Sequence, residues 1–411
     1  MQADSALGGS RKALEALAPD GEAGQWSEVQ VQGLTVPCWE RAFWTARQRQ
    51  AHSLQEISYR ACYKPQLPRC FIEALTAPDD RVLDPFGGRG TTGLEAALLG
   101  RRVASNDANP LSALLLAPRL DPPDPEAVAE RLGAIPWRTT EHDGLDLSMF
   151  YHPDTEGALR ALRAWFLARE ASGDLDAVDA WIRMVATNRL TGHSPGFFSV
   201  YTLPPNQATS PKSQQAINAK RNQTPPFRDV PSLILRKTRQ LLKDLTAEDR
   251  ARLRETGATA HLSTGDAANL QGIPEASVAL TVTSPPFLDV VQYAADNWLR
   301  CWFNGLDADA LGTRLTVPGS LGAWTQAMGG VFRELARVTR SGGHVAFEVG
   351  EVRKGTIRLE ETILPLGLAV GFEPLGVLVN RQVFTKTAHI WGVDNNARGT
   401  NSNRIALFRK P

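Results

Sequence analysis

Four consecutive residues, Ser284, Pro285, Pro286 and Phe287, follow an apolar run that has the pattern of a buried strand. A Pro-Pro pair donates no backbone hydrogen bonds and keeps the chain extended, so it stiffens the exit of the strand. Rigid carbonyl and hydroxyl oxygens at such a place can serve as fixed hydrogen-bond acceptors for a substrate. Prolines also simply end strands in many proteins, so the tetrapeptide alone indicates either a turn or a site.

A second candidate site is the glycine-rich stretch DPFGGRGTT, in which Gly88, Gly90 and Gly93 have the spacing G-x-G-x-x-G. It follows a predicted strand and precedes a predicted helix, and Asp107 ends the next strand. This arrangement is typical of sites for a nicotinamide dinucleotide, a flavin or S-adenosylmethionine. No Lys follows the last glycine in the way that a P-loop requires, which excludes a P-loop nucleotide site.

Asp84 favours the last of these three ligands. It stands at the strand end beneath the loop, where its carboxylate would repel the doubly charged pyrophosphate of a dinucleotide. S-adenosylmethionine instead carries an ammonium and a sulfonium group, which an acidic strand tip attracts, while Asp107 can bind the ribose hydroxyls. We therefore predict S-adenosylmethionine as the cofactor. A simpler role for Asp84, capping of the following turn, stays open.

Together these stretches resemble the amino-group DNA methyltransferases, which methylate exocyclic nitrogens of cytosine or adenine. ACYKPQLPRCFIEAL resembles motif X of that family, DPFGGRGTT motif I, SNDANP motif II, STGDAANL motif III and TSPPF the catalytic motif IV. LARVTRSGGHVAFEVGE resembles the helix and strand that follow. The resemblance covers about Tyr59 to Asp107 and His261 to Lys410, and it leaves the segment between them and the N-terminal arm unmatched.

The resemblance implies direct methyl transfer to the amine of a base that has been rotated out of the duplex. Ser284 and the stiff Pro285-Pro286 pair would hold acceptors that localise the lone pair of the amine, and Phe287 would stack on the base. In this family, Ser at the first position is associated mainly with N4 of cytosine. We therefore expect a DNA (cytosine-N4)-methyltransferase. The alternatives are an adenine-N6 or RNA amino-methyltransferase and a non-catalytic nucleic-acid-binding protein.

The resemblance also implies a set of cofactor contacts. Asp266, beside Ala267, would accept a hydrogen bond from the adenine amino group, and Lys64 would lie near the methionine carboxylate. The other expected contacts, some of which could equally be core or helix-start residues, are Asp84, Phe86, Gly88, Gly90, Thr91, Thr92 and Asp107.

A basic segment predicts where nucleic acid would bind. The whole chain carries a net charge of +1, but the segment from Trp181 to Gln240 holds nine Lys or Arg residues against Asp229 alone. Such a local excess, with interleaved Asn, Gln and aromatic residues, is typical of a phosphate-binding surface, although a flexible polar loop has the same composition. We predict contacts with double-stranded DNA at Arg189, Lys212, Lys220, Arg221 and Arg228.

The elements that must position these residues indicate an α/β fold. A strand over 82–83, a helix over 92–99 and a strand over 103–107 form one βαβ unit, and further strands and helices alternate from 277 to 371. GVLVNRQVFTKT and NRIALFRKP indicate a final antiparallel pair. We predict a Rossmann-like class I methyltransferase sheet, mostly parallel, with an antiparallel strand near the C-terminus and a helical and coil insertion.

We divide the chain into an N-terminal arm and helix over 1–50, a catalytic domain over 51–115 and 255–411, and a basic module over 116–254 as the candidate target-recognition region. The spacing of Trp39, Phe43 and Trp44 predicts a helix from Pro37 to Gln50. Within the module we expect helices over 156–170, 174–190 and 232–245, with a coil-rich tract over 192–231. The module precedes motif III, which departs from the usual place of a recognition domain in this family.

Composition argues against several other classes of protein. The four cysteines form no CxxC pair and have no histidine at ligand spacing, so we expect neither a metal site nor a disulfide framework. No apolar run approaches the ~20 residues that span a bilayer, and no leader-like segment opens the sequence, so we expect a cytoplasmic protein without a membrane partner. A cognate restriction endonuclease is a candidate partner, and the sequence indicates no oligomeric state.

Overall fold

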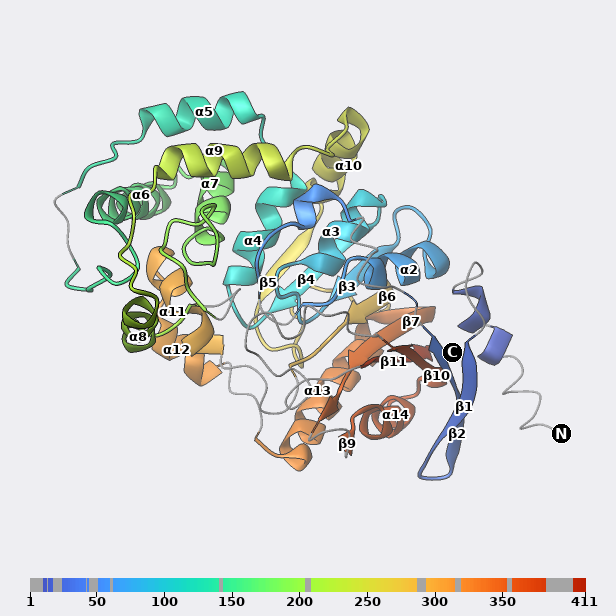
Figure 1. Cartoon of the computed structure of the whole chain (residues 1–411). Helices are drawn as coiled ribbons and strands as arrows, with labels where there is room; N and C mark the ends of the chain where they lie inside the picture. The colour runs from blue at the N-terminus through green and yellow to red at the C-terminus, as the bar shows by residue number, and fades with distance from the viewer. Residues whose placement is uncertain are drawn as a thin grey trace.

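The computed structural model describes residues 10–12, 14–17, 24–41, 43, 51–59, 62–139, 143–203, 208–286, 293–314, 319–352, 357–381 and 402–411. In this part of the chain one sheet has the strand order β1-β2-β10-β11-β7-β6-β3-β4-β5 (Figure 1), and β8 (Glu351–Val352) and β9 (Ile357–Arg358) form a separate pair. The strands of the large sheet are β1 (Gln25–Val31), β2 (Leu34–Arg41), β3 (Arg81–Asp84), β4 (Arg102–Asp107), β5 (His261–Thr264), β6 (Val278–Thr283), β7 (Thr339–Val349), β10 (Glu373–Arg381) and β11 (Ser402–Arg409).

The centre of the sheet is parallel and doubly wound. β3 pairs in parallel with β4 on one side and with β6 on the other, and β5 and β7 extend these two sides in the same direction. β11 runs antiparallel to both β7 and β10. This arrangement confirms the predicted Rossmann-like class I methyltransferase sheet. Because the strand order reverses between β3 and β6, a ligand crevice is expected beyond the carboxyl ends of these two strands.

Helices cover both faces of the sheet (Figure 1). They are α2 (Gln66–Leu75), α3 (Thr91–Leu98), α4 (Leu111–Leu120), α10 (Ala247–Ala258), α13 (Leu321–Val338) and α14 (Glu360–Ala369). Alternate strand residues serve the two faces: Val82 and Val103 belong to the apolar layer that includes α3 and α4, whereas Leu83 and Ala104 belong to the layer that includes Phe332 of α13. This period of two is what a sheet buried on both faces requires.

The N-terminal part of the sheet corrects one prediction. β1 and β2 form a hairpin, and β2 pairs in parallel with β10, so the hairpin widens the sheet. Pro37–Arg41, predicted as the start of a helix, belongs to β2, whereas residues 42 and 44–50 lie outside the described part. Trp39 is the register partner of Trp26, and their rings stack with centroids 5.2 Å apart. Cross-strand aromatic pairing of this kind stabilises a hairpin and outweighs the helix-like spacing.

A group of helices between β4 and β5 lies beside the sheet, together with two helices that follow β6 (Figure 1). They are α5 (Pro125–Ala134), α6 (Pro153–Ser172), α7 (Ala177–Thr187), α8 (Pro211–Arg221), α9 (Val230–Leu241), α11 (Tyr293–Phe303) and α12 (Ala308–Arg314). α6, α7 and α9 confirm the three predicted helices. The predicted coil over 192–231 is wrong at α8, where Ser210 accepts a hydrogen bond from the Ser213 amide at 3.2 Å and Pro211 begins the helix.

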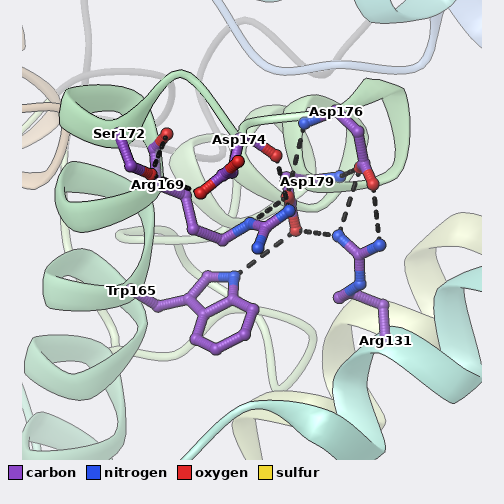
Figure 2. Close-up of polar contacts among 7 residues, drawn as sticks. All are labelled: Arg131, Trp165, Arg169, Ser172, Asp174, Asp176 and Asp179. Atoms are coloured by element: carbon purple, nitrogen blue, oxygen red, sulfur yellow. Dashed lines mark hydrogen bonds and ion pairs between the residues drawn. The ribbon is translucent and has the colours of Figure 1, made fainter.

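One buried carboxylate fastens α5, α6 and α7 together (Figure 2). Asp179 of α7 accepts hydrogen bonds from Arg131 of α5 at 2.5 Å, from Arg169 of α6 at 2.6 Å and from the Trp165 indole at 3.4 Å. Asp176 accepts from the same Arg131 at 2.7 Å and caps the start of α7. A carboxylate that would be costly to bury alone is therefore compensated by two guanidinium groups.

The helical insertion leaves the α/β body and rejoins it at one place. Asp121, directly after α4, pairs with Arg254 of α10 at 3.1 Å, and Asp124 pairs with Arg250 of the same helix at 3.1 Å. α10 also packs closely on α4, since a Cβ at Gly257 would lie 2.9 Å from the Leu120 carbonyl oxygen. The segment 125–246 is therefore an excursion whose two ends meet.

Three further properties of the described residues concern membrane spans, metal sites and cysteines. None of the helices in the described residues combines the length and apolar character that a membrane span requires. In the same residues, no group of three or more His, Cys, Asp or Glu side chains is placed to hold a metal ion. Cys38, Cys62, Cys70 and Cys301 are free thiols.

Candidate active site

The carboxyl ends of the central strands bring separate parts of the sequence to one edge of the sheet. β3 ends at Asp84, β4 ends at Asp107, and Ser284 directly follows β6. These strands are parallel neighbours about 5 Å apart, so their ends lie side by side. The edge therefore unites the predicted cofactor loop with the predicted catalytic tetrapeptide.

The glycine-rich loop turns from β3 into α3 in a backbone conformation that favours glycine. Gly88 has a φ of +54°, and Gly90, the residue that caps α3, has a φ of +79°. Residues with a Cβ are strained in this left-handed region. At Gly90 a Cβ would also lie 2.8 Å from the Leu116 side chain of α4, whereas at Gly88 its nearest neighbour would be a Tyr59 ring carbon at 3.6 Å. Gly90 therefore serves packing as well as the turn, and Gly88 serves the turn.

Asp107 holds the tip of this loop. The Gly88 amide donates to Oδ2 at 2.7 Å, and the Asn109 amide donates to Oδ1 at 2.8 Å. Desolvation raises the pKa of the half-buried Asp107 to about 6; the two amide bonds oppose this rise, and the Asp84 charge adds to it. Each carboxylate oxygen has a further lone pair beyond its amide bond. Asp107 can therefore still accept a hydrogen bond from a ligand hydroxyl.

Asp84 is buried and is surrounded by protein donors. Thr283 Oγ1 donates to its Oδ1 at 2.6 Å, the Phe86 amide donates to the same atom at 3.1 Å, and the Tyr63 hydroxyl donates to Oδ2 at 2.7 Å. Burial raises the pKa of Asp84, and these hydrogen bonds oppose the rise. Asp84 thus joins β3 to β6 and to the segment before α2. Its hydrogen bond with the Phe86 amide also caps the following turn, which is the alternative role considered from the sequence.

The two threonines at the start of α3 use their hydroxyls inside the protein. Thr91 Oγ1 accepts from Arg89 Nε at 2.9 Å, and Thr92 Oγ1 donates to the Val282 carbonyl oxygen at 3.1 Å. The Thr92 hydroxyl also lies next to the Tyr63 hydroxyl. Both threonines therefore hold the loop against its neighbours, while their cofactor contacts stay predictions.

Two other predicted cofactor residues lie on the segments next to Asp84. Phe86 is partly buried against the apolar layer that includes α13. Lys64 directly follows Tyr63, and its carbonyl oxygen accepts from the Leu67 amide at the start of α2 at 3.0 Å. Both residues are thus close in sequence to groups that bond Asp84.

Asp266 and Ala267 follow β5 at the same edge. The Gly265 amide donates to the Asp107 carbonyl oxygen at 3.0 Å, so the turn after β5 lies against the end of β4. Asp266 is exposed and accepts from the Ala268 amide at 2.9 Å, whereas Ala267 is buried. The exposed carboxylate is available to a ligand that extends from Asp107 along the edge.

The catalytic tetrapeptide is fixed from two sides. The Trp324 indole of α13 donates to the Pro286 carbonyl oxygen at 3.0 Å, and the Ser284 hydroxyl donates to Glu348. Pro285 is buried, and no hydrogen bond from a described residue occupies its carbonyl oxygen. Phe287 lies outside the described residues. Ser284 and Pro285 thus present oxygens on a rigid support.

Glu348 was not among the residues that the sequence predicted. It lies near the carboxyl end of β7, the strand beside β6, and is only 4% exposed. It accepts hydrogen bonds from Ser284 and from the Asn403 side-chain amide of β11. Burial raises the pKa of Glu348 to about 7, and the Asp84 charge contributes to the rise. The available signal was an acid inside the apolar strand HVAFEV, because a buried acid needs partners.

The predicted DNA contacts lie on the insertion. The Arg189 guanidinium lies over the Phe197 ring, 4.0 Å from its centroid, and Arg221 lies over Tyr201 at 3.9 Å. Asp229, the single acid in the basic segment, caps α9. The other three predicted contacts are two exposed residues of α8 and one partly buried residue before α9: Lys212, Lys220 and Arg228.

Hydrogen bonds join the insertion to α11, the first described element after the tetrapeptide. The Ala208 amide donates to the Asp296 carbonyl oxygen at 2.9 Å, and the Trp298 indole donates to the Thr209 carbonyl oxygen at 3.1 Å. The segment that leads into α8 is therefore held by a helix that begins shortly after Pro286.

Residues 26–112 match a family model described as DNA methylase. The matched segment contains the hairpin, the glycine-rich loop and Asp107, and it ends before Ser284. No curated protein matches the whole chain or a part of it.

Several solved structures are similar to parts of the chain. A protein from Thermus thermophilus described as a DNA modification methylase is 26% identical over 36% of this chain and 51% of its own, with a TM-score of 0.22. Its complex with S-adenosyl-L-methionine gives 25% identity over the same shares, with a TM-score of 0.23. The rRNA methyltransferase AviRa from Streptomyces viridochromogenes is 12% identical over 90% of this chain and 96% of its own, with a TM-score of 0.33. The chain thus spans about half the length of the DNA modification methylase structures that it matches.

Proposed function

We propose that the chain is an S-adenosylmethionine-dependent DNA methyltransferase that methylates the exocyclic N4 amine of cytosine in duplex DNA. The observation that carries the proposal is the placement of Ser284, bonded to Glu348, and the Pro285 carbonyl oxygen beside the glycine-rich loop. The match of residues 26–112 to DNA methylases supports the same reading.

The acidic edge of the sheet suits this cofactor. When bound, S-adenosylmethionine supplies a methyl group on a positively charged sulfur. Asp84 and Glu348 would supply negative charge for the sulfonium and ammonium groups, and Asp107 and the exposed Asp266 would offer lone pairs to the ribose hydroxyls and the adenine amine. The predicted contacts that would complete the cofactor site are Lys64, Phe86, Gly88, Gly90, Thr91, Thr92 and Ala267.

Ser284 and Pro285 would activate the amine of the substrate. An amine attached to a pyrimidine is a poor nucleophile because its lone pair is delocalised into the ring. Since the Ser284 hydroxyl hydrogen is directed to Glu348, the oxygen lone pairs are left to accept an amine hydrogen. The Pro285 carbonyl oxygen would accept the other, and the Trp324 bond to Pro286 keeps both acceptors in place.

Glu348 would be the final acceptor in the transfer of the proton that the amine loses. The nitrogen gains a methyl group and must lose one hydrogen. Ser284 Oγ would accept that proton while its own hydroxyl proton passes to the Glu348 carboxylate, so both protons are accounted for. A pKa of about 7 suits a group that accepts and releases protons near neutral pH. The bond from Asn403 keeps the carboxylate oriented.

The substrate base must leave the duplex before its amine can reach this edge. Phe287 is the predicted stacking partner of the rotated base, and the module over 116–254 is the predicted DNA-binding region. We favour cytosine over adenine because Ser284 stands at the first position of the tetrapeptide. A cytoplasmic location and a cognate restriction endonuclease stay predictions.

The experiment that tests the proposal is nucleoside mass spectrometry of duplex DNA incubated with the purified protein and S-adenosylmethionine. N4-methylcytosine is the expected product, and the Ser284→Ala variant serves as the control for contaminating activity. N6-methyladenine would contradict the choice of base, and transfer to RNA alone would contradict the choice of DNA. No transfer to any nucleic acid would contradict the proposed activity.

A further inference from the structure

Two sets of cations in and beside the insertion differ in their partners. Seven Arg residues of α5, α6, α7 and α10 form ion pairs with Asp or Glu: Arg131, Arg160, Arg169, Arg183, Arg250, Arg252 and Arg254. The segment 189–239 contains eight Lys or Arg residues, and none of them forms an ion pair with a described residue: Arg189, Lys212, Lys220, Arg221, Arg228, Arg236, Lys237 and Arg239. The charge of the first group is balanced by carboxylates, whereas the second group has no ion pair with a described residue.

Three cations of the second group gather where the chain after α7 meets α9. Arg236 Nη2 donates to the Pro195 carbonyl oxygen at 3.5 Å, and the same loop carries Phe197, the ring beneath Arg189. The pKa of Arg189 is lowered to about 10, mainly by burial, with smaller contributions from the charges of Arg300 and Arg236. Burial lowers the pKa of Lys237 to about 8, with a further contribution from Arg189. Arg189 is therefore repelled by both Arg236 and Lys237, and we call these three residues the cation cluster.

Neutral groups are the hydrogen-bond partners of the buried Lys237 and the partly buried Arg189. Lys237 is 6% exposed and donates to Gln240 Oε1 at 3.2 Å. Arg189 donates to the carbonyl oxygen and the side-chain oxygen of Asn188 at 3.0 and 3.1 Å. Glu56 raises the pKa of Lys237 by less than Arg189 lowers it, and its carboxylate is bound by Gln240 at 2.7 Å. Burying a cation without a carboxylate partner costs free energy. An anion that binds from outside the protein would offset this cost.

The cation cluster adjoins the catalytic edge. Asn188, the neighbour of Arg189, exchanges two hydrogen bonds with the Ser58 backbone, each 2.7 Å long. The next residue, Tyr59, carries the ring that faces Gly88 of the glycine-rich loop. The cation cluster is therefore linked to the glycine-rich loop through Asn188, Ser58 and Tyr59.

We infer that Arg189, Arg236 and Lys237 bind a backbone phosphodiester of duplex DNA next to the rotated base. The inference rests on the proposed function for its ligand. A phosphodiester is an anion with two unesterified oxygens, which a planar guanidinium binds in pairs and a lysine binds as a point charge. The Phe197 ring fixes the plane of the Arg189 guanidinium before the ligand arrives.

The test is the salt dependence of DNA binding, measured by fluorescence anisotropy with a labelled duplex of about 30 base pairs. In wild type the logarithm of the association constant should fall linearly with the logarithm of the NaCl concentration. Arg236→Met, on the exposed side of α9, should reduce that slope by about 0.9, the value of one phosphate contact. Lys237→Met should reduce it by a similar amount. Arg333→Met on the exposed side of α13 removes the same charge elsewhere and should leave the slope unchanged.

Thermal unfolding separates binding from a structural role. Lys237→Met replaces a buried cation with an apolar side chain of similar length, so its melting temperature without DNA should equal or exceed that of wild type. Weaker binding without lower stability supports the inference. An unchanged salt slope in Arg236→Met overturns it, as does a wild-type protein that binds a single-stranded RNA but not the duplex.

The failure of this inference can be told from the failure of the proposed function. Binding is measured without S-adenosylmethionine, so it requires no chemistry. Normal formation of N4-methylcytosine with an unchanged slope in the cluster variants would remove the phosphate site and keep the activity. Reduced salt slopes in the cluster variants, with no methylated base in the wild-type assay, would keep the phosphate site and contradict the proposed activity.

Discussion

Ser284 and Glu348 share a hydrogen bond across neighbouring strands, and the carboxylate that accepts it is almost fully buried. The serine follows β6 and the glutamate stands near the end of β7, so the sheet itself fixes the pair. The bond settles which way the serine hydroxyl points, and it connects the substrate side of the edge to a group that titrates near neutral pH.

Ser284→Ala should lower kcat by about 100-fold to 1000-fold, the usual effect of removing one fixed polar group that stabilises a transition state. Its affinity for S-adenosylmethionine should stay the same, because the cofactor residues lie on other segments. Steady-state kinetics and calorimetric titration check the two parts. Ser341→Ala, at an exposed position of β7, is the matched control. Wild-type turnover in Ser284→Ala would remove the serine from the mechanism.

Glu348→Gln should change the pH profile of turnover. In wild type, kcat should fall as the pH drops through about 7, because the protonated carboxyl can no longer receive the Ser284 proton. Glutamine keeps the shape of the side chain but cannot accept a proton, so kcat should fall by about 100-fold and lose this acidic limb. A variant that retained the limb would show that another group titrates there.

The same substitution should change stability in a pH-dependent way. The pKa of Glu348 in the folded state is raised to about 7 from an ordinary value of 4.5, so the folded protein binds this proton more tightly than the unfolded chain. The stabilisation is present below about pH 4.5 and is lost as the pH rises through about 7. Urea unfolding of wild type should therefore show a loss of roughly 3 kcal/mol across this window that Glu348→Gln lacks. Parallel curves for the two proteins would contradict the raised pKa.

Asp107→Ala should weaken the binding of S-adenosylmethionine. The carboxylate holds the Gly88 amide and is the proposed acceptor for the ribose hydroxyls, so its loss should remove charge-assisted hydrogen bonds worth about 1.5–3 kcal/mol each. We expect at least a tenfold higher Kd by isothermal titration calorimetry. Asp154→Ala, an exposed position on α6, is the control. Unchanged affinity in Asp107→Ala would move the ribose contact to another residue.

Asp179→Asn should destabilise the insertion. The change removes the charge that compensates Arg131 and Arg169, and breaking a buried ion pair usually costs about 3–5 kcal/mol (Figure 2). Urea unfolding measures the loss directly. Asp154→Asn, whose side chain is 76% exposed, should change stability very little. An equal effect of the two substitutions would show that the buried carboxylate is not what joins the helices.

The sequence predicted the parts of the fold that depend on local patterns. The strand, glycine turn and helix around Gly88 and Gly90 were expected because those residues are neighbours in the chain and glycine has a specific conformational role there. α8 was missed because its composition suits a loop, although Ser210 and Pro211 form a recognisable start signal for a helix.

Residues whose role depends on distant partners were harder to predict. Trp39 suggested a helix until its cross-strand partner Trp26 was known. Glu348 was a lone acid in a strand, and its meaning comes from Ser284 and Asn403, which reach it only through the order of strands in the sheet. The pattern of residue types along the chain does not reveal the order of the strands in the sheet.

The two ion pairs that close the insertion, Asp121 with Arg254 and Asp124 with Arg250, have an evolutionary consequence. Because the excursion over 125–246 starts and ends at one place, a change in its length costs little chain entropy, about 0.6 kcal/mol for a doubling. A recombination event that exchanged this stretch as a cassette would leave the ends of β3, β4 and β6 where they are. On the proposed assignment of this stretch to DNA binding, new target preferences would arise in one step and the residues of the catalytic edge would be inherited unchanged.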